Sequence, residues 1–229
     1  MPNPATESRI RDAALTLFAL QGFTETTVRQ IAERASVSAG LVIHYYGSKD
    51  GLRAACDRHV AELIRLGKEG AAAQGTGLDP LAALRQAGEG PPLARYLVRA
   101  FAEGSPGAAD LYDQLVTDAV GYLETMVATG VMRPGDDLFG RAVVLTTWSL
   151  GALVFHQHLD RLLGVDLLAH PLEPANSSAY LGPALEILSD GVLAPAVAER
   201  FRAAFAANGR GGGGGGNDDR RAEGGTDDG

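Results

Sequence analysis

Residues 26–52 read TTVRQIAERASVSAGLVIHYYGSKDGL, and this stretch decides the fold. Its Thr27-Val28-Arg29-Gln30 run has the spacing of a capping box, in which the threonine and glutamine side chains cap each other's backbone at a helix start. We expect that helix to end near Ala35. Ser38 is a good N-cap residue for a second short helix, from Ala39 to about Tyr45. Two short helices joined by three or four residues are typical of a helix-turn-helix.

Helical periodicity extends on both sides of this stretch. Upstream, apolar residues recur at helical spacing from Ile10 to Phe18, which predicts a helix that ends near Gly22. Downstream, Ser48 is placed to cap a helix from Lys49 to about Gly70. Further helices are predicted over about 79–87, 93–102, 106–129, 137–163, 179–190 and 195–207. Because strand-like alternation is missing before residue 209, the sequence predicts an all-α fold.

Charge divides the 229 residues into unequal parts. The whole chain carries a formal net charge of −8, which by itself argues against nucleic-acid binding. However, residues 1–60 hold seven basic and six acidic residues, whereas residues 61–208 hold ten and seventeen. The tail, 209–229, is rich in Gly and Asp, and we expect it to be disordered. The acidity therefore belongs to the distal part of the chain, and the N-terminal part is slightly basic.

Composition also bears on the compartment. The single cysteine, Cys56, cannot form an internal disulfide, which points to a reducing environment. The first ten residues are polar and lack the apolar core of a signal peptide, so we expect a cytoplasmic protein. The longest stretch without charged residues or histidine, Ala142 to Phe155, is shorter than the roughly 20 residues that a membrane helix needs, so no membrane contact is expected.

Five motifs, in order, resemble the DNA-binding domain of the tetracycline-repressor (TetR/AcrR) family of bacterial transcriptional regulators. They are Ala13–Phe18, Gln21–Phe23, Thr26–Ala32, Ala35–Gly40 and His44–Leu52. The resemblance implies an N-terminal three-helix helix-turn-helix domain at residues 1–52 that continues into the helix at about 49–70. It also implies a larger helical ligand-binding and dimerisation domain at 53–208. The matching motifs end at Leu52, so this second domain is expected from the family's architecture alone.

The resemblance and the chemistry of helix starts together indicate a DNA-contacting surface. Capping hydroxyls at Thr27 and Ser38 lie beside free backbone N–H groups, which favour phosphate. Ile43 and Ala39 stand where the family often has polar residues, so base recognition is expected to rely on apolar contact. The alternative for Thr27 and Ser38 is that they only cap their helices. The alternative for His44 is that it is an ordinary solvated surface histidine. The candidate DNA-binding residues are Thr27, Arg29, Ser38, Ala39, Gly40, Leu41, Ile43, His44, Tyr45 and Lys49.

Two amphipathic faces in the distal part suggest a small-molecule site. One face runs from Tyr112 to Met126 and the other from Val144 to Phe155. An apolar pocket with a few polar groups is typical of such sites, although aromatic residues at this spacing also form ordinary core. The candidate ligand-binding residues are Tyr96, Phe101, Tyr112, Val116, Ala119, Tyr122, Met126, Thr147, Trp148, Gly151 and Phe155.

These observations lead to one main functional hypothesis and two alternatives. The main hypothesis is a homodimeric repressor that binds a palindromic operator in double-stranded DNA and releases it when a small apolar or amphipathic effector binds. The first alternative is a DNA-binding regulator controlled by a protein partner or by concentration. The second is a helical-bundle enzyme or carrier that retains a helix-turn-helix. We expect no catalytic residues, metal or cofactor, because nucleophile elbows and phosphate loops are missing, and His156, His158 and Asp160 do not share one helical face.

Overall fold

The computed structural model describes residues 4–79, 92–104, 107–168 and 174–209. Within these ranges the regular secondary structure is helical, with no strand. The chain divides into two compact units, residues 1–181 and 182–229. The all-α prediction is confirmed. The predicted helix at 79–87 and the predicted disorder of 210–229 lie outside the described residues.

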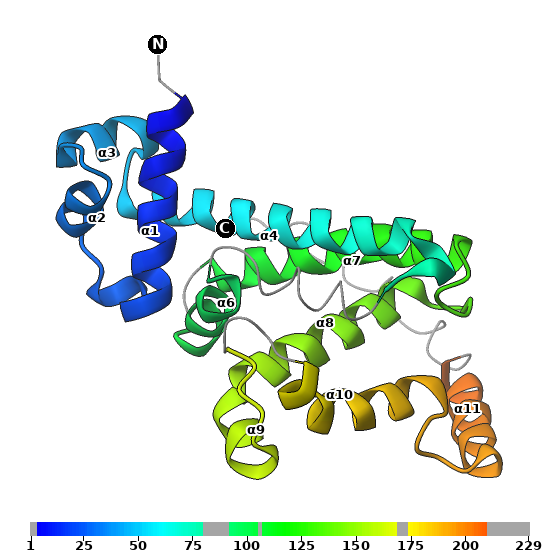
Figure 1. Ribbon diagram of the computed structural model, residues 1–229. Coiled ribbons are helices and arrows are strands. Elements are labelled where there is room, and N and C mark those ends of the chain that lie inside the picture. Colours follow the sequence, from blue (N-terminus) through cyan, green and yellow to red (C-terminus); the bar gives the residue numbers. More distant parts are fainter. Residues whose placement is uncertain (1–3, 80–91, 105–106, 169–173, 210–229) are drawn as a thin grey trace, which may run out of the picture. The chain divides into compact units, whose positions relative to one another are not determined.

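Four helices build the N-terminal part (Figure 1). They are α1 (Pro4–Glu25), α2 (Val28–Arg34), α3 (Ala39–Tyr46) and α4 (Lys49–Ala73). The first three gather around the first turns of α4, and Ile10, Phe18, Ile31, Val42 and Leu52 form a fully buried core between them. This core orients α2 and α3 relative to each other because each contributes a buried aliphatic residue to it.

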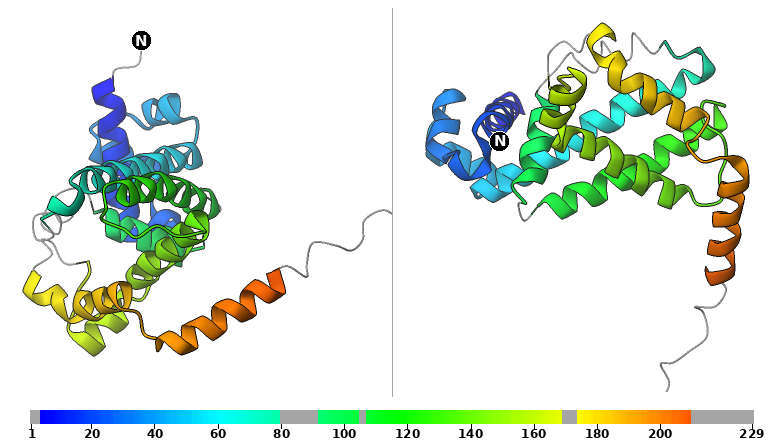
Figure 2. Two further views of the ribbon diagram at one scale, coloured as in Figure 1. Left: turned by 90° about the vertical axis from the view of Figure 1, so that its right-hand side faces the viewer. Right: turned by 90° about the horizontal axis from the view of Figure 1, so that it is seen from below.

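The distal part of the first unit contains α6 (Leu93–Ala102), α7 (Ala108–Ala128), α8 (Leu138–Val154) and α9 (His156–Leu163). A single 3-10 turn, η1 (Gly75–Gly77), follows α4. Helices α4 and α7 run side by side in all views, and α8 packs against α7 (Figures 1 and 2). The small second core of Val116, Ala119, Leu123 and Ala142 lies between α7 and α8. The structure therefore joins the two parts through one continuous helix, α4.

The largest difference from the predicted helices lies at Phe155. The sequence predicts a single helix over 137–163, whereas the structure has α8 and α9, separated at Phe155 and bent by 69°. The prediction was wrong here because neither proline nor glycine occurs between Ala152 and His158 to mark the break. By contrast, the predicted helix at 93–102 coincides with α6.

The last two helices cross into or lie in the second unit. Helix α10 spans Pro174–Ser189 and begins earlier than the predicted 179, and α11 spans Pro195–Gly209. In α11 the rings of Phe201 and Phe205 stack with centroids 6.0 Å apart on an exposed face. Among the described helices none is long and apolar enough to cross a membrane alone, although the bent pair α8 and α9 meets that criterion by length and composition.

Candidate nucleic-acid interface

The start of α2 has the capping box that the sequence predicts. The Gln30 backbone N–H donates to the Thr27 hydroxyl oxygen at 3.2 Å, and the Thr27 backbone N–H donates to the Gln30 side-chain oxygen at 2.8 Å. The Gln21 side-chain amide also donates to the Gln30 oxygen at 3.3 Å, which connects α1 to the cap. This network fixes the position where α2 begins.

The turn between α2 and α3 is a Schellman motif. The Ser36 N–H donates to the Glu33 carbonyl at 3.1 Å, and the Val37 N–H donates to the Ala32 carbonyl at 2.9 Å. Ser36 has a φ of +53°, in the left-handed region that favours glycine. The turn therefore has the regular hydrogen bonds of this motif. Its left-handed position, where glycine is favoured, is held by Ser36.

Helix α3 presents one face to solvent and anchors the other. Ser38 caps it, because its hydroxyl accepts the Leu41 N–H at 3.2 Å. Val42 is fully buried and Ile43 next to it is 42% exposed. Ala39, Gly40 and His44 are also exposed, and Leu41 is half-buried. The apolar Ile43 side chain therefore lies on the outer surface without contributing to the buried core.

The last turn of α3 and the start of α4 are tied to α1. The Tyr46 hydroxyl donates to the Glu7 carbonyl at 2.8 Å, and burial raises the pKa of Tyr46 to about 12. Lys49 donates to the Thr24 carbonyl at 3.3 Å, and its ammonium lies 4.3 Å from the centroid of the Phe23 ring. Tyr45 and Tyr46 are both half-buried.

The structure brings the predicted DNA-contacting residues to the helix-turn-helix and its flanks. Thr27 and Arg29 are exposed at the start of α2, and Ser38 is exposed at the start of α3. The two helix starts thereby offer hydroxyls and backbone N–H groups, the chemistry that binds phosphate. Lys49 differs from the others, because it also stabilises the end of α1.

A second site lies in the distal part of the first unit. A cavity of about 280 Å³ opens between α4, α6, α7 and α8. Its wall is mostly aliphatic, with three hydroxyl groups and one charged side chain. The lining residues are Ile64, Lys68, Leu97, Leu115, Tyr122, Leu123, Met126, Met132, Leu145, Thr146, Ser149, Leu150 and Leu153.

Among the predicted ligand-contacting residues, Tyr122 and Met126 line this cavity. The α8 residues of that prediction, Thr147, Trp148, Gly151 and Phe155, are outside its lining, which uses the neighbouring face of α8. Phe155 is 60% exposed. The sequence predicts an amphipathic helix, but both faces of α8 carry apolar residues, so periodicity alone does not show which face borders the cavity.

The other predicted ligand contacts have structural roles. Tyr96 is buried and its hydroxyl donates to the Asp57 carboxylate at 2.6 Å. The Phe101 and Tyr112 rings meet edge to face, and the Tyr112 hydroxyl lies 2.7 Å from that of Thr147. Val116 and Ala119 are buried in the second core. These five residues therefore lie outside the cavity wall.

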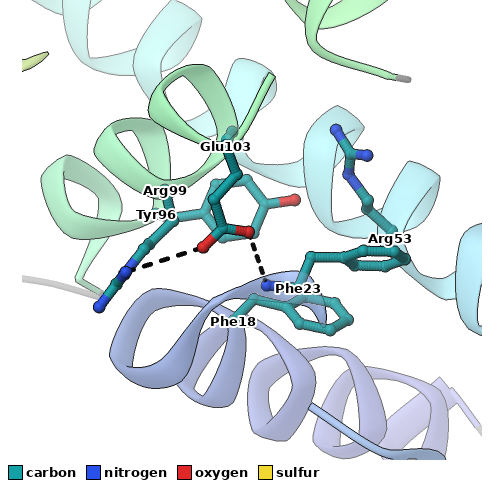
Figure 3. Close-up of a pocket in the computed structure, with 7 residues that line it drawn as sticks. Phe18, Phe23, Arg53, Tyr96, Arg99 and Glu103 are labelled. Carbon is teal, nitrogen blue, oxygen red and sulfur yellow. Dashed lines mark hydrogen bonds and ion pairs between the residues drawn. The ribbon is translucent and has the colours of Figure 1, made fainter. Parts of the chain in front are cut away.

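Sequence reasoning missed the junction between α6 and α1 (Figure 3). There the Glu103 carboxylate accepts the Phe23 backbone N–H at 3.1 Å, and the Arg99 guanidinium lies 3.7 Å from the same carboxylate. Arg99 also donates to the Leu20 carbonyl at 3.4 Å. No local pattern could have revealed the contacts of Glu103 and Arg99 with α1, because about 80 residues separate those partners in the chain.

Comparison with known proteins decides the family. Residues 10–56 match the family model described as "Bacterial regulatory proteins, tetR family", and residues 89–194 match "Tetracyclin repressor-like, C-terminal domain". The chain is 36% identical to the HTH-type transcriptional regulatory protein RaaS of Mycobacterium tuberculosis over 187 residues, covering 82% of this chain and 86% of RaaS. The chain belongs to the TetR family. It is thus a DNA-binding transcriptional regulator, a class of protein that is not enzymatic.

Solved TetR-like structures share the fold. A structure titled "Molecular basis for control of antibiotic production by a bacterial hormones" has a TM-score of 0.57 at 20% identity, covering 84% of this chain and all of the other. A putative TetR-family transcriptional regulator from Rhodococcus sp. has a TM-score of 0.55 at 18% identity, covering 79% of this chain and 98% of its own. The N-terminal motifs predicted membership of the TetR family and its all-helical fold, and both are confirmed.

Proposed function

We propose that the chain acts in the cytoplasm as a homodimeric repressor, with residues 1–52 as the DNA-binding domain and 53–208 as the effector-binding and dimerisation domain. Two copies present two α3 helices to successive major grooves of a palindromic operator, about 34 Å apart. A small apolar or amphipathic effector in the distal cavity lowers the affinity for that operator.

The observation that carries this proposal is the continuity of α4. The helix starts at Lys49, beside the helix-turn-helix, and contributes Ile64 and Lys68 to the cavity wall. At 1.5 Å per residue, the 15 residues from Lys49 to Ile64 span about 22 Å. A bound effector that prefers a shifted α4 would therefore alter the separation of the two α3 helices, by an amount limited by its differential affinity for the two states.

Helix α6 supplies a second route between the same sites. Leu97 lines the cavity, and Arg99 and Glu103 contact the end of α1 (Figure 3). A displacement of α6 in the cavity would be transmitted to α1, which packs against α2. The coupling is then carried by two packed helices with ends at both sites.

Dimerisation is supported by apolar side chains that one chain leaves exposed. On α8, Phe139 and Val144 are 64% and 63% exposed, and on α10, Leu185 and Leu188 are also exposed. Single exposed apolar residues are ordinary, but several on one helix are typical of an interface. Sedimentation of the wild type and of Val144→Asp tests this role; we expect a dimer and a monomer, respectively.

A DNA-binding experiment tests the proposal as a whole. Fluorescence anisotropy with DNA from upstream of the chain's own gene should show saturable binding that survives a large excess of unrelated DNA at moderate salt. The double variant Tyr45→Ala/Lys49→Ala should lose that binding, with circular dichroism confirming the fold. Absence of sequence-selective binding by the wild type would contradict the proposal. Binding that no small molecule weakens would favour the alternative of control by a protein partner.

A further inference from the structure

The distal cavity has an unusual charge distribution. Its wall is formed by aliphatic and methionine side chains, with hydroxyl groups from Tyr122, Thr146 and Ser149. Among the described residues that line it, Lys68 is the only charged one, and none carries a carboxylate. An exposed ammonium in the wall of an otherwise apolar cavity gives that cavity a positive charge with which an anionic group of a ligand can pair.

The surroundings of Lys68 leave its charge without a counterion in the described part of the chain. The acidic neighbours on its own helix, Glu62 and Glu69, both pair with Arg65 at 2.7 Å. On the facing α7, Asp118 accepts a hydrogen bond from the Gln114 side chain at 2.8 Å. Neighbouring protein atoms desolvate the Lys68 ammonium and lower its pKa, and no carboxylate opposes that shift. The residue itself is exposed, so an anion from solvent can reach its ammonium.

We propose that the effector is an amphipathic monoanion, with a carboxylate bound by the Lys68 ammonium and an apolar body held by the aliphatic wall. This inference rests on the proposed function and specifies the chemistry of its effector. An ammonium and a carboxylate form a strong charge-assisted hydrogen bond. Met126 and Met132 give the wall the adaptability that a flexible chain requires.

The cavity volume sets the size of the probe. At about 30 Å³ for each group of the size of a water molecule, 280 Å³ accommodates roughly nine such groups. Decanoate therefore matches the cavity in approximate volume and in charge. Decanol has the same chain with a neutral head, and decyltrimethylammonium has the same chain with a cationic head.

Isothermal titration of the full chain with these three probes tests the inference. We expect decanoate to bind at least tenfold more tightly than decanol, and decyltrimethylammonium to bind most weakly. Lys68→Met keeps the length of the side chain and removes its charge, so this variant should bind decanoate and decanol about equally. Lys68→Arg retains the charge and should retain most of the preference. Arg58→Gln removes an exposed cation from the same helix outside the cavity wall and should behave as the wild type.

Each contrary outcome overturns the inference. Equal affinity of the wild type for decanoate and decanol would do so, as would failure of all three probes to bind, or a preference for decanoate that persists in Lys68→Met. DNA binding of the ligand-free protein is measured in parallel. Sequence-selective DNA binding without decanoate binding would refute the effector chemistry alone, whereas Lys68-dependent decanoate binding without DNA binding would refute the proposed function alone.

Discussion

The Glu103 carboxylate, at the end of α6, accepts a hydrogen bond from the backbone N–H of Phe23, next to the break in α1, at 3.1 Å. Gly22 makes this approach feasible. It has a φ of +84°, and a side chain at this position would collide with the Glu103 carboxylate. The distal part of the chain therefore holds the end of α1 through a charge-assisted hydrogen bond, directly beside the ring against which Lys49 packs.

Removal of that carboxylate should weaken this junction. We expect Glu103→Ala to lower the free energy of unfolding by about 1 kcal/mol, because the Phe23 N–H loses its acceptor. Glu103→Gln keeps an acceptor oxygen and loses only an exposed ion pair, so its loss should be under half as large. Urea denaturation of both variants measures the difference; equal losses would show that the hydrogen bond contributes little.

Relief of backbone strain at Ser36 should stabilise the helix-turn-helix. Its φ of +53° is unfavourable for a side chain and ordinary for glycine. We expect Ser36→Gly to raise the free energy of unfolding by about 0.5–1 kcal/mol, after allowance for the greater entropy of glycine in the unfolded chain. Ser36→Val provides the opposite control and should destabilise. A lower urea midpoint for Ser36→Gly would refute the strain argument.

Ile43 offers a test of base contact that is separate from folding. Because its side chain is exposed, Ile43→Ala should change the free energy of unfolding by less than about 0.5 kcal/mol. If Ile43 contacts thymine methyl groups, the same variant should weaken operator binding by about 1 kcal/mol, which is roughly fivefold in Kd. Leu66→Ala, an equally exposed aliphatic residue on α4, is the matched control and should bind DNA as the wild type does. Identical Kd values for all three proteins would exclude the contact.

Asp57 should make stability depend on pH. Burial raises the pKa of its carboxyl, although the Tyr96 hydroxyl and the Arg53 guanidinium, 3.6 Å away, both oppose that shift. A raised pKa means that the folded state binds the proton more tightly than the unfolded state. The resulting stabilisation is complete below the unfolded pKa of about 3.9 and is lost as the pH rises through the folded pKa.

Asp57→Asn removes this titration and leaves an oxygen for the Tyr96 hydroxyl. Relative to the variant, the wild type should therefore lose stability as the pH rises from 4 towards neutrality. Urea midpoints of both proteins at several pH values between 4 and 7 provide the comparison. Parallel pH profiles would show that the Asp57 carboxyl has the same pKa in both states.

The sequence alone predicted the helix-turn-helix to within a few residues, because its determinants are local. The caps at Thr27, Ser38 and Ser48 each act on a backbone group three residues away. The same local pattern carried the resemblance that placed the chain in its family. Only the tertiary structure decided the break at Phe155, because neither proline nor glycine marks the position where packing bends the chain.

At the distal cavity, too, the sequence predicted only part of the arrangement. Amphipathy predicted that α7 and α8 would border a cavity, and Tyr122 and Met126 do line it. Periodicity could not determine which face of α8 turns inward, since both faces are apolar, nor that Lys68 of α4 would supply the charge. The Glu103 and Phe23 contact likewise appeared only in the fold. Local sequence determined the DNA-binding motif through short-range hydrogen bonds, whereas long-range packing alone decided which side chains from four helices meet at the distal cavity.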